Sequence, residues 1–181
     1  LTQGLDIFGN IAMQVGSTMM SKGISAGEGE DGKGIAGFLN NNQNFISTLL
    51  GGLNASASFA TGGIAGNRKI NAEGGEVVEM PGSSPKELQG PLHSQGGIDM
   101  TVPSGTEIYS DRLVGADGKT MADRKKLREK QISKIEKLLQ KNPNDPALKK
   151  TLEKTKQNND FLDKQDLSQM QFVKDLVDHT N

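Results

Sequence analysis

The 181-residue chain has no cysteine, no tryptophan and only two histidines, and aromatic residues make up 4% of it. Without cysteine it can form neither a disulfide framework nor a thiolate metal site, and its redox compartment stays open. With only His93 and His179, a histidine-based metal centre would need carboxylates as its other ligands. We therefore expect no cofactor, no metal site and no small-molecule substrate.

Apolar residues are also scarce, at 33% of the chain. No stretch approaches the roughly 18 consecutive apolar residues that a membrane-spanning helix needs. A chain of this composition cannot easily offset the entropy of ordering by burying its own apolar surface, so we expect its fold to depend on partners. It opens at Leu1 without Met or a signal-peptide pattern, and we expect it to be a piece of a longer or processed protein.

Glycine and charge divide the chain at the same place. All 23 glycines lie at or before Gly118, and the net charge is -6 up to that residue and +5 after it. We predict a modular, loosely packed α+β fold in three parts. These are a Gly-rich, partly helical segment over 1–60, a small Gly-punctuated β module over 61–118, and a basic helical hairpin with a third helix over 119–181.

The first part has two apolar stretches with helical spacing, residues 5–20 and 44–53, joined by a Gly-rich acidic linker over 23–37. The first stretch supplies a candidate surface for docking on a partner or a membrane. Its members are Leu5, Phe8, Val15 and Met19. We favour docking in an oligomeric wall over membrane activity.

The second part alternates short β-like runs with turn signals. Ile98, Met100 and Val102 alternate with polar residues, which is typical of a half-buried strand. Residues 103–105 form a turn before the next strand, and the glycine pairs at 62–63, 74–75 and 96–97 indicate further turns rather than phosphate-binding loops. We predict three or four strands here.

The third part has well-marked helix ends. Thr120 and Asp123 match a capping box, and the first helix should end at Asn142-Pro143. Asp145 and Pro146 begin a second, antiparallel helix. Residues 161–177 are predicted as a third helix. The first helix has a narrow apolar stripe: Leu127, Ile132, Ile135, Leu138 and Leu139.

Two sets of residues are candidates for a site. In the β module an acid/base or cation site is conceivable, although solvated strand residues are the favoured interpretation: His93, Asp99, Glu107, Tyr109 and Asp111. On the hairpin a basic set could face nucleic acid or an acidic protein: Arg124, Lys125, Lys126, Arg128, Lys130, Lys134 and Lys137. No aromatic lies among them to stack bases, so we favour a protein-facing surface. No serine, histidine and aspartate spacing indicates a nucleophile, and we predict no enzyme.

Five short motifs over residues 60–170 carry a resemblance. They are Glu-Gly-Gly-Glu (73–76), His-x-x-Gly-Gly (93–97), Pro-x-Gly-Thr (103–106), Tyr-Ser-Asp-Arg (109–112) and Lys-Thr-Met-Ala-Asp-Arg-Lys (119–125). Together they resemble virion tail or cargo proteins of crAss-like phages, the short-tailed viruses of gut Bacteroides. Residues 59–63 are also similar to the tail ends of phage tape-measure proteins.

The resemblance implies a structural or cargo protein inside the portal, tail or capsid of a virion, possible ejection into the host cell with the genome, and no catalytic residues. Its partners would be portal, tail or ring proteins and copies of itself. The opposed charges of front and rear would favour head-to-tail contact between copies. Contact with phage DNA through the hairpin, or transient contact with a host membrane, stay open as alternatives.

Overall fold

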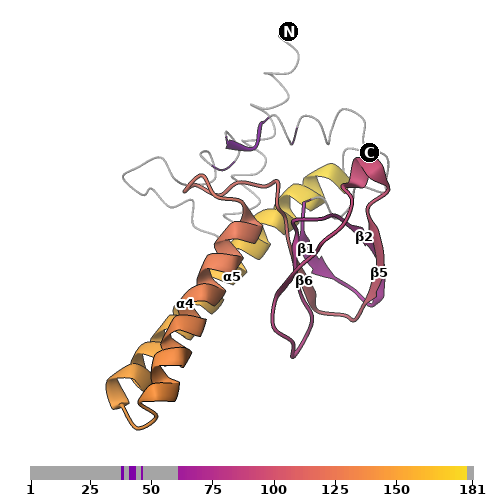
Figure 1. Cartoon of the computed structure of the whole chain (residues 1–181). Coiled ribbons are helices and arrows are strands. Elements are labelled where there is room, and N and C mark those ends of the chain that lie inside the picture. Colours follow the sequence, from indigo (N-terminus) through magenta and orange to yellow (C-terminus); the bar gives the residue numbers. More distant parts are fainter. Residues whose placement is uncertain (1–37, 39–40, 44–45, 47–60, 179–181) are drawn as a thin grey trace.

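The computed structural model describes residues 38, 41–43, 46 and 61–178. It contains six short strands and a long helical hairpin (Figure 1). The α+β class predicted from the sequence is confirmed. Strand formation follows the alternating apolar runs and the turns that separate them. The strands are β1 Gly63–Ala65, β2 Arg68–Ala72, β3 Val77–Glu79, β4 Lys86–Glu87, β5 Ile98–Val102 and β6 Thr106–Tyr109.

The strands form two antiparallel sheets rather than the single small unit of three or four strands that we predicted. One sheet has the order β1-β6-β3-β4, and β2 pairs with β5 in a second. In the central strands, successive side chains point to opposite faces of the sheet. Val77 and Tyr109 face the helices, whereas Val78 and Ile108 pack toward the β2–β5 pair. The two central strands of the four-stranded sheet, β3 and β6, are thus covered on both faces.

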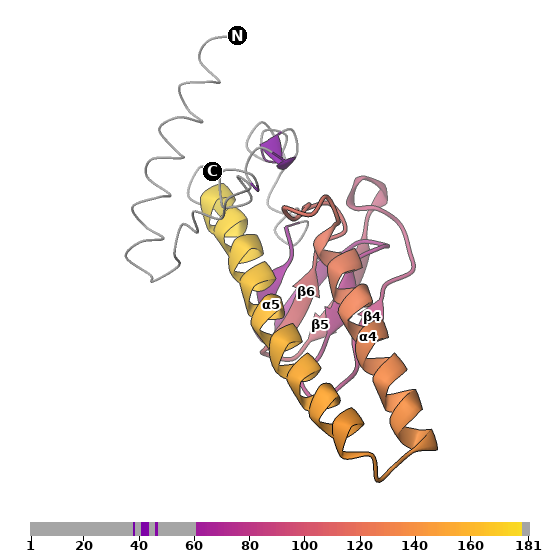
Figure 2. The same cartoon turned by 90° about the vertical axis from the view of Figure 1, so that its left-hand side faces the viewer.

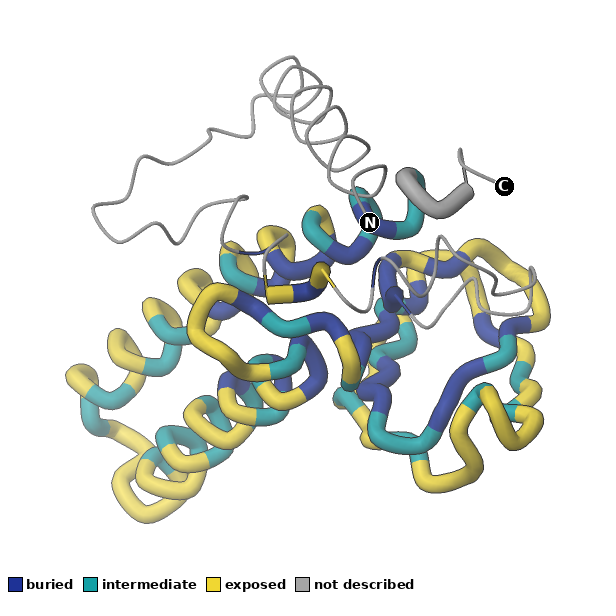
Figure 3. The backbone as a smooth tube through the Cα atoms, turned by 90° about the horizontal axis from the view of Figure 1, so that it is seen from above, coloured by how far each residue is buried: buried dark blue, intermediate teal, exposed yellow. Residues whose placement is uncertain are grey.

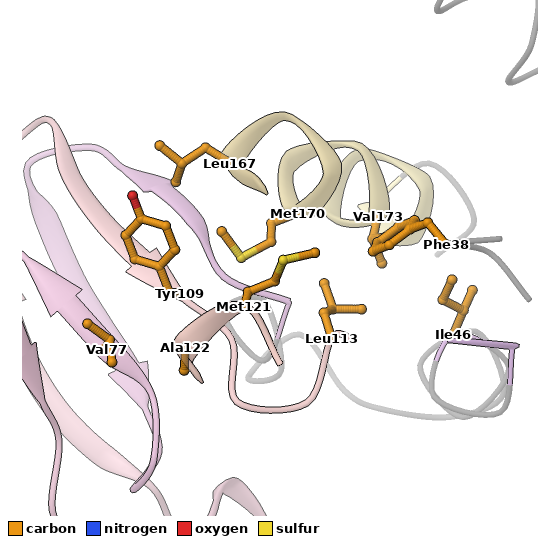
Figure 4. Packing of buried hydrophobic residues seen from close by; sticks show 10 residues of the cluster. All are labelled: Phe38, Ile46, Val77, Tyr109, Leu113, Met121, Ala122, Leu167, Met170 and Val173. Atoms are coloured by element: carbon orange, nitrogen blue, oxygen red, sulfur yellow. The ribbon is translucent and has the colours of Figure 1, made fainter. Parts of the chain in front are cut away.

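The main hydrophobic core lies between this sheet and the helices (Figure 4). Tyr109, Leu113 and Met121 are completely buried there beside Met170 and Val173. Phe38 and Ile46, from the first part of the chain, close the same cluster. The β module and the hairpin, predicted as separate parts, therefore share one core.

The hairpin consists of α4, Met121–Lys141, and α5, Pro146–Asp178. Both predicted helix starts are confirmed. The Thr120 hydroxyl accepts a hydrogen bond from the Asp123 amide at 3.1 Å, and an Asp145 carboxylate oxygen accepts one from the Ala147 amide at 2.8 Å. The predicted third helix is wrong as a separate element, because α5 continues through it. After Pro146 the chain has no proline or glycine that would end the helix.

The predicted apolar stripe of α4 is only partly buried. Leu127 and Leu138 are 44% and 48% exposed, whereas Lys125 and Arg128 are buried. In the first turns of α4, the side that packs against the rest of the protein therefore consists partly of charged side chains. Among the described residues, the two helices have only each other as neighbours farther from the sheet (Figure 2). Exposure increases toward their connecting turn (Figure 3).

Replacing Thr120 with alanine is expected to lower the free energy of unfolding by about 1 kcal/mol, because the Asp123 amide loses its acceptor at the start of α4. Urea unfolding followed by circular dichroism measures the change. Thr151→Ala is the matched control: its hydroxyl bonds back to the Ala147 carbonyl inside α5, where alanine is the better helix former. Equal losses in both variants would contradict the cap.

Candidate functional site

A tight turn between β2 and β3 carries two buried glutamates. Gly75 has φ of 101°, and a Cβ on it would lie 2.7 Å from Asp111 Oδ2. Glycine is therefore required there for both conformation and space. The turn directs the side chains of Glu73 and Glu76 inward, and both residues are fully buried.

Glu73 is paired with Arg112. The guanidinium contacts both carboxylate oxygens, with Nη2 to Oε2 at 2.6 Å and Nε to Oε1. The His93 amide also donates to Oε2, at 3.1 Å. Burial opposes ionisation of Glu73, but these donors and the charge of Arg112 outweigh it and hold its pKa below the ordinary value. Glu73 is an ionised carboxylate in a bidentate pair.

Glu76 lacks such a counter-charge. Its Oε2 accepts from the Glu73 amide at 3.0 Å, while its Oε1 is buried without a hydrogen-bond partner. Burial, followed by the nearby charges of Glu73 and Asp111, raises the pKa of Glu76 to about 9. Asp111 is affected in the same way: burial and the charge of Glu73 raise its pKa to about 6. Three carboxylates thus surround one guanidinium.

His93, in the short helix η2 His93–Gln95, lies against these carboxylates. Its Nδ1 is 2.7 Å from Asn71 Oδ1, and the Asn71 amide nitrogen donates to Gly96 O at 2.9 Å and to Asp99 Oδ1 at 2.8 Å. Since the Asn71 nitrogen is committed to these acceptors, its oxygen must accept from His93, which places the proton on Nδ1. Burial lowers the pKa of His93, which favours this neutral form.

Ligand atoms of Glu73, Glu76 and His93 all lie within 4.8 Å of one another. We call these three residues with Asp111 and Arg112 the Glu73 cluster. Two carboxylates and an imidazole are a set that can hold a divalent cation or a shared proton.

The sequence prediction found two of the five residues of this cluster. His93 and Asp111 belong to it, and Asp99 reaches His93 through Asn71. Glu107 and Tyr109 instead bond to each other at 2.8 Å, and Tyr109 is a core residue rather than a solvated one. Glu73, Glu76 and Arg112 were missed as site residues. Their signal was the spacing of charged residues beside glycine pairs in Glu-Gly-Gly-Glu and His-x-x-Gly-Gly, together with Tyr-Ser-Asp-Arg.

Because of the Glu73 cluster, we expect the protein, kept free of metal by a chelator, to become less stable as the pH rises. The folded form retains a proton on Glu76 up to a pKa of about 9, whereas the unfolded chain releases it near 4.5. Stability is therefore greatest near the lower value and declines between the two. Urea unfolding at about pH 6 and about pH 8 measures the loss. Glu76→Gln should flatten the dependence and Glu153→Gln, on an exposed face of α5, should not; a steep dependence in Glu76→Gln would contradict the assignment.

Three of the predicted basic residues form a second ionic group, between the hairpin and the sheet. Lys125 Nζ contacts Asp163 and Glu79, each at 2.7 Å. Arg128 contacts Asp163 and Asp166, each at 2.6 Å, and Arg124 contacts Asp166 at 2.6 Å. These three cations are neutralised inside the chain, so their prediction as an exposed assembly or nucleic-acid surface is wrong. These ion pairs could not be predicted from the sequence, because the acidic partners of the three cations lie about 40 residues away along the chain.

The remaining basic candidates lie at the surface. Lys126 contacts Asp123 at 2.9 Å and Glu87 at 3.3 Å, and Lys130, Lys134 and Lys137 are exposed along α4. The docking candidates Leu5, Phe8, Val15 and Met19 lie outside the described residues. Neither described helix combines the length and apolar character needed to cross a membrane.

Comparison with known proteins gives no relative. The chain matches no protein family, no curated protein and no solved structure.

Proposed function

We propose that this protein is a non-enzymatic structural or cargo protein of a tailed-phage particle, and that its hairpin is an assembly surface. One observation carries the proposal: the hairpin projects beyond the sheets as a two-helix arm (Figure 1), and its helices carry large exposed apolar side chains. Leu138 on α4 is 48% exposed and Phe161 on α5 is 62% exposed. An arm of this kind suits packing against other protein chains.

The proposed partners are portal, tail or ring proteins and further copies of the chain. The lysines along the arm favour acidic protein surfaces, which they would approach rapidly at moderate salt. The five motifs that resemble virion tail or cargo proteins add the particle itself as the proposed location. Much of this motif set lies in the β module and not in the arm. The arm and the β module would therefore have different partners.

The proposal is tested by assembly. Leu138→Glu with Phe161→Glu changes only exposed side chains, so the protein should still fold, as checked by circular dichroism. We expect this variant to be lost from particles purified from cells that produce it in place of the wild type, with mass spectrometry as the measurement. The control is Gln140→Glu with Gln157→Glu, which adds the same two negative charges at polar exposed positions. Undiminished incorporation of the Leu138/Phe161 variant would overturn the arm as assembly surface.

Ejection is tested on the same particles. If the protein is cargo, it should leave together with the genome when release is triggered, and emptied particles should lack it. If it is a fixed part of the portal or tail, intact and emptied particles should contain equal amounts. Absence from both would overturn the location in the virion.

A second candidate function, contact with the phage genome, is favoured by one feature of the arm. Lys130, Lys134, Lys137 and Lys141 are all exposed at spacings that place them along one side of α4. Such a row fits a phosphate backbone. Affinity for DNA should then fall steeply with salt concentration, and alanine at Lys134 and Lys137 should reduce the slope of the log-log plot by about 2.

A further inference from the structure

The Glu73 cluster contains more acceptor atoms than donors can satisfy. Glu76 Oε1 is buried without a hydrogen-bond partner, and so is His93 Nε2. Because Nδ1 of His93 carries the proton that Asn71 accepts, Nε2 presents a lone pair. A carboxylate oxygen and an imidazole lone pair near each other both require something positive.

The net charge of the Glu73 cluster also requires a positive species beside these side chains. With Glu73, Glu76 and Asp111 ionised and Arg112 protonated, the cluster has a net charge of -2. Arg112 is already used by Glu73, which it contacts at both oxygens. Neutrality then requires either two protons or one divalent cation. Buried charge is costly unless it is compensated, so one of the two must be present.

The surroundings of His93 favour the cation. Metal-ligating histidines almost always donate their other ring nitrogen to an oxygen that fixes the tautomer and the ring orientation. Asn71 does this here, and it is itself held by Asp99 and Gly96. The three supporting residues leave Nε2 directed away from them, as a ligand nitrogen must be.

We propose that Glu73, Glu76 and His93 bind a divalent transition-metal cation, with zinc as the expected occupant. Mixed nitrogen and carboxylate ligands suit zinc, and bonds of about 2.1 Å would require the ligand atoms to approach one another to about 3.4 Å. From a maximum separation of 4.8 Å, this is a contraction of at most about 1.4 Å. The cation would connect the turn at 73–76 to the segment that begins at His93. It would thus stabilise the β module as a structural metal ion.

The test is a zinc titration of the full chain by isothermal calorimetry after removal of metals. We expect one zinc ion per chain, a rise in Tm on binding, and release of protons near pH 7, detected with buffers of different ionisation enthalpy. His93→Gln should weaken zinc binding by about 10-fold to 100-fold or more. Asn71→Ala, which removes the acceptor that orients the imidazole but no proposed zinc ligand, should weaken it by about 10-fold.

Two variants keep the test decisive. His179→Gln removes the only other histidine of the chain and should bind zinc as the wild type does. Glu76→Gln keeps the shape and is neutral, like the protonated Glu76 of the metal-free protein, so it should fold at least as stably as the wild type without metal and yet lose zinc affinity. A reduced affinity cannot then be attributed to unfolding.

Three results would overturn the proposal. They are no zinc binding by folded wild-type protein at micromolar concentrations, binding unchanged in both His93→Gln and Glu76→Gln, or equal losses in His93→Gln and His179→Gln. The first would assign neutrality of the cluster to bound protons instead. The metal site does not rest on a role in the virion, so its failure would leave the assembly proposal intact.

Discussion

Replacing Tyr109 with alanine is expected to lower the free energy of unfolding by about 3 to 5 kcal/mol. Tyr109 is fully buried and is one of the largest side chains of the core between sheet and helices (Figure 4). Its ring also lies 5.2 Å from Lys125 Nζ, and its hydroxyl donates to Glu107. Truncation would therefore leave a cavity at the place where β6 contacts the hairpin. Urea unfolding followed by circular dichroism measures the loss.

Phe161→Ala is the matched control for Tyr109. It also removes a large aromatic side chain, but this side chain is 62% exposed on α5. We expect a change within about 0.5 kcal/mol, as for surface positions in general. Losses of similar size in the two variants would mean that the buried position of Tyr109 is not what stabilises the fold. The same control also serves the assembly proposal, because Phe161 should matter for incorporation and not for stability.

Replacing Asp166 with alanine is expected to cost about 3 kcal/mol, the lower end of the range for an unpaired buried charge. The Asp166 side chain is 1% exposed and contacts both Arg124 and Arg128 at 2.6 Å. Without it, Arg124 keeps only Asp117 at 3.7 Å, whereas Arg128 keeps Asp163. The cost arises from cations left inside the protein rather than from lost apolar packing, and the same urea titration measures it.

Glu136→Ala is the control for Asp166. Glu136 pairs with Lys156 at 3.0 Å, but the two side chains are 44% and 49% exposed. Solvent screens such a pair, and its removal should cost less than about 1 kcal/mol. If Asp166→Ala were as mild as Glu136→Ala, the ionic group between hairpin and sheet would be expendable for folding.

Local signals in the sequence predicted the elements that depend on local chemistry. The hydroxyl of Thr120 and the carboxylate of Asp145 identify the two helix starts, because a cap acts within four residues. The alternation of Ile98, Met100 and Val102 predicted a strand at these residues, where the structure has β5. The prediction of a third helix was wrong because it also relied on local signals. A change in the apolar pattern was interpreted as a helix boundary, although no residue there ends a helix.

Long-range pairing was not predictable in this way. Lys125 and Arg128 were expected at the surface because lysine and arginine usually are, and only the antiparallel return of α5 supplies Asp163 and Asp166. The Glu73 cluster combines segments near residues 73, 93 and 111, each of which looks like an ordinary polar turn. A single sequence shows the glycines that make those turns possible but not that the turns meet.

The two-sided burial of β6 has a mechanical consequence. This strand is hydrogen-bonded to β1 and β3 and covered on both faces, so its amides should exchange with deuterium only when the whole protein opens. The connecting turn of the hairpin, with solvent on most sides, has no such protection. The arm should therefore open locally at this turn, and its amides there should exchange quickly, while the strands around β6 stay folded.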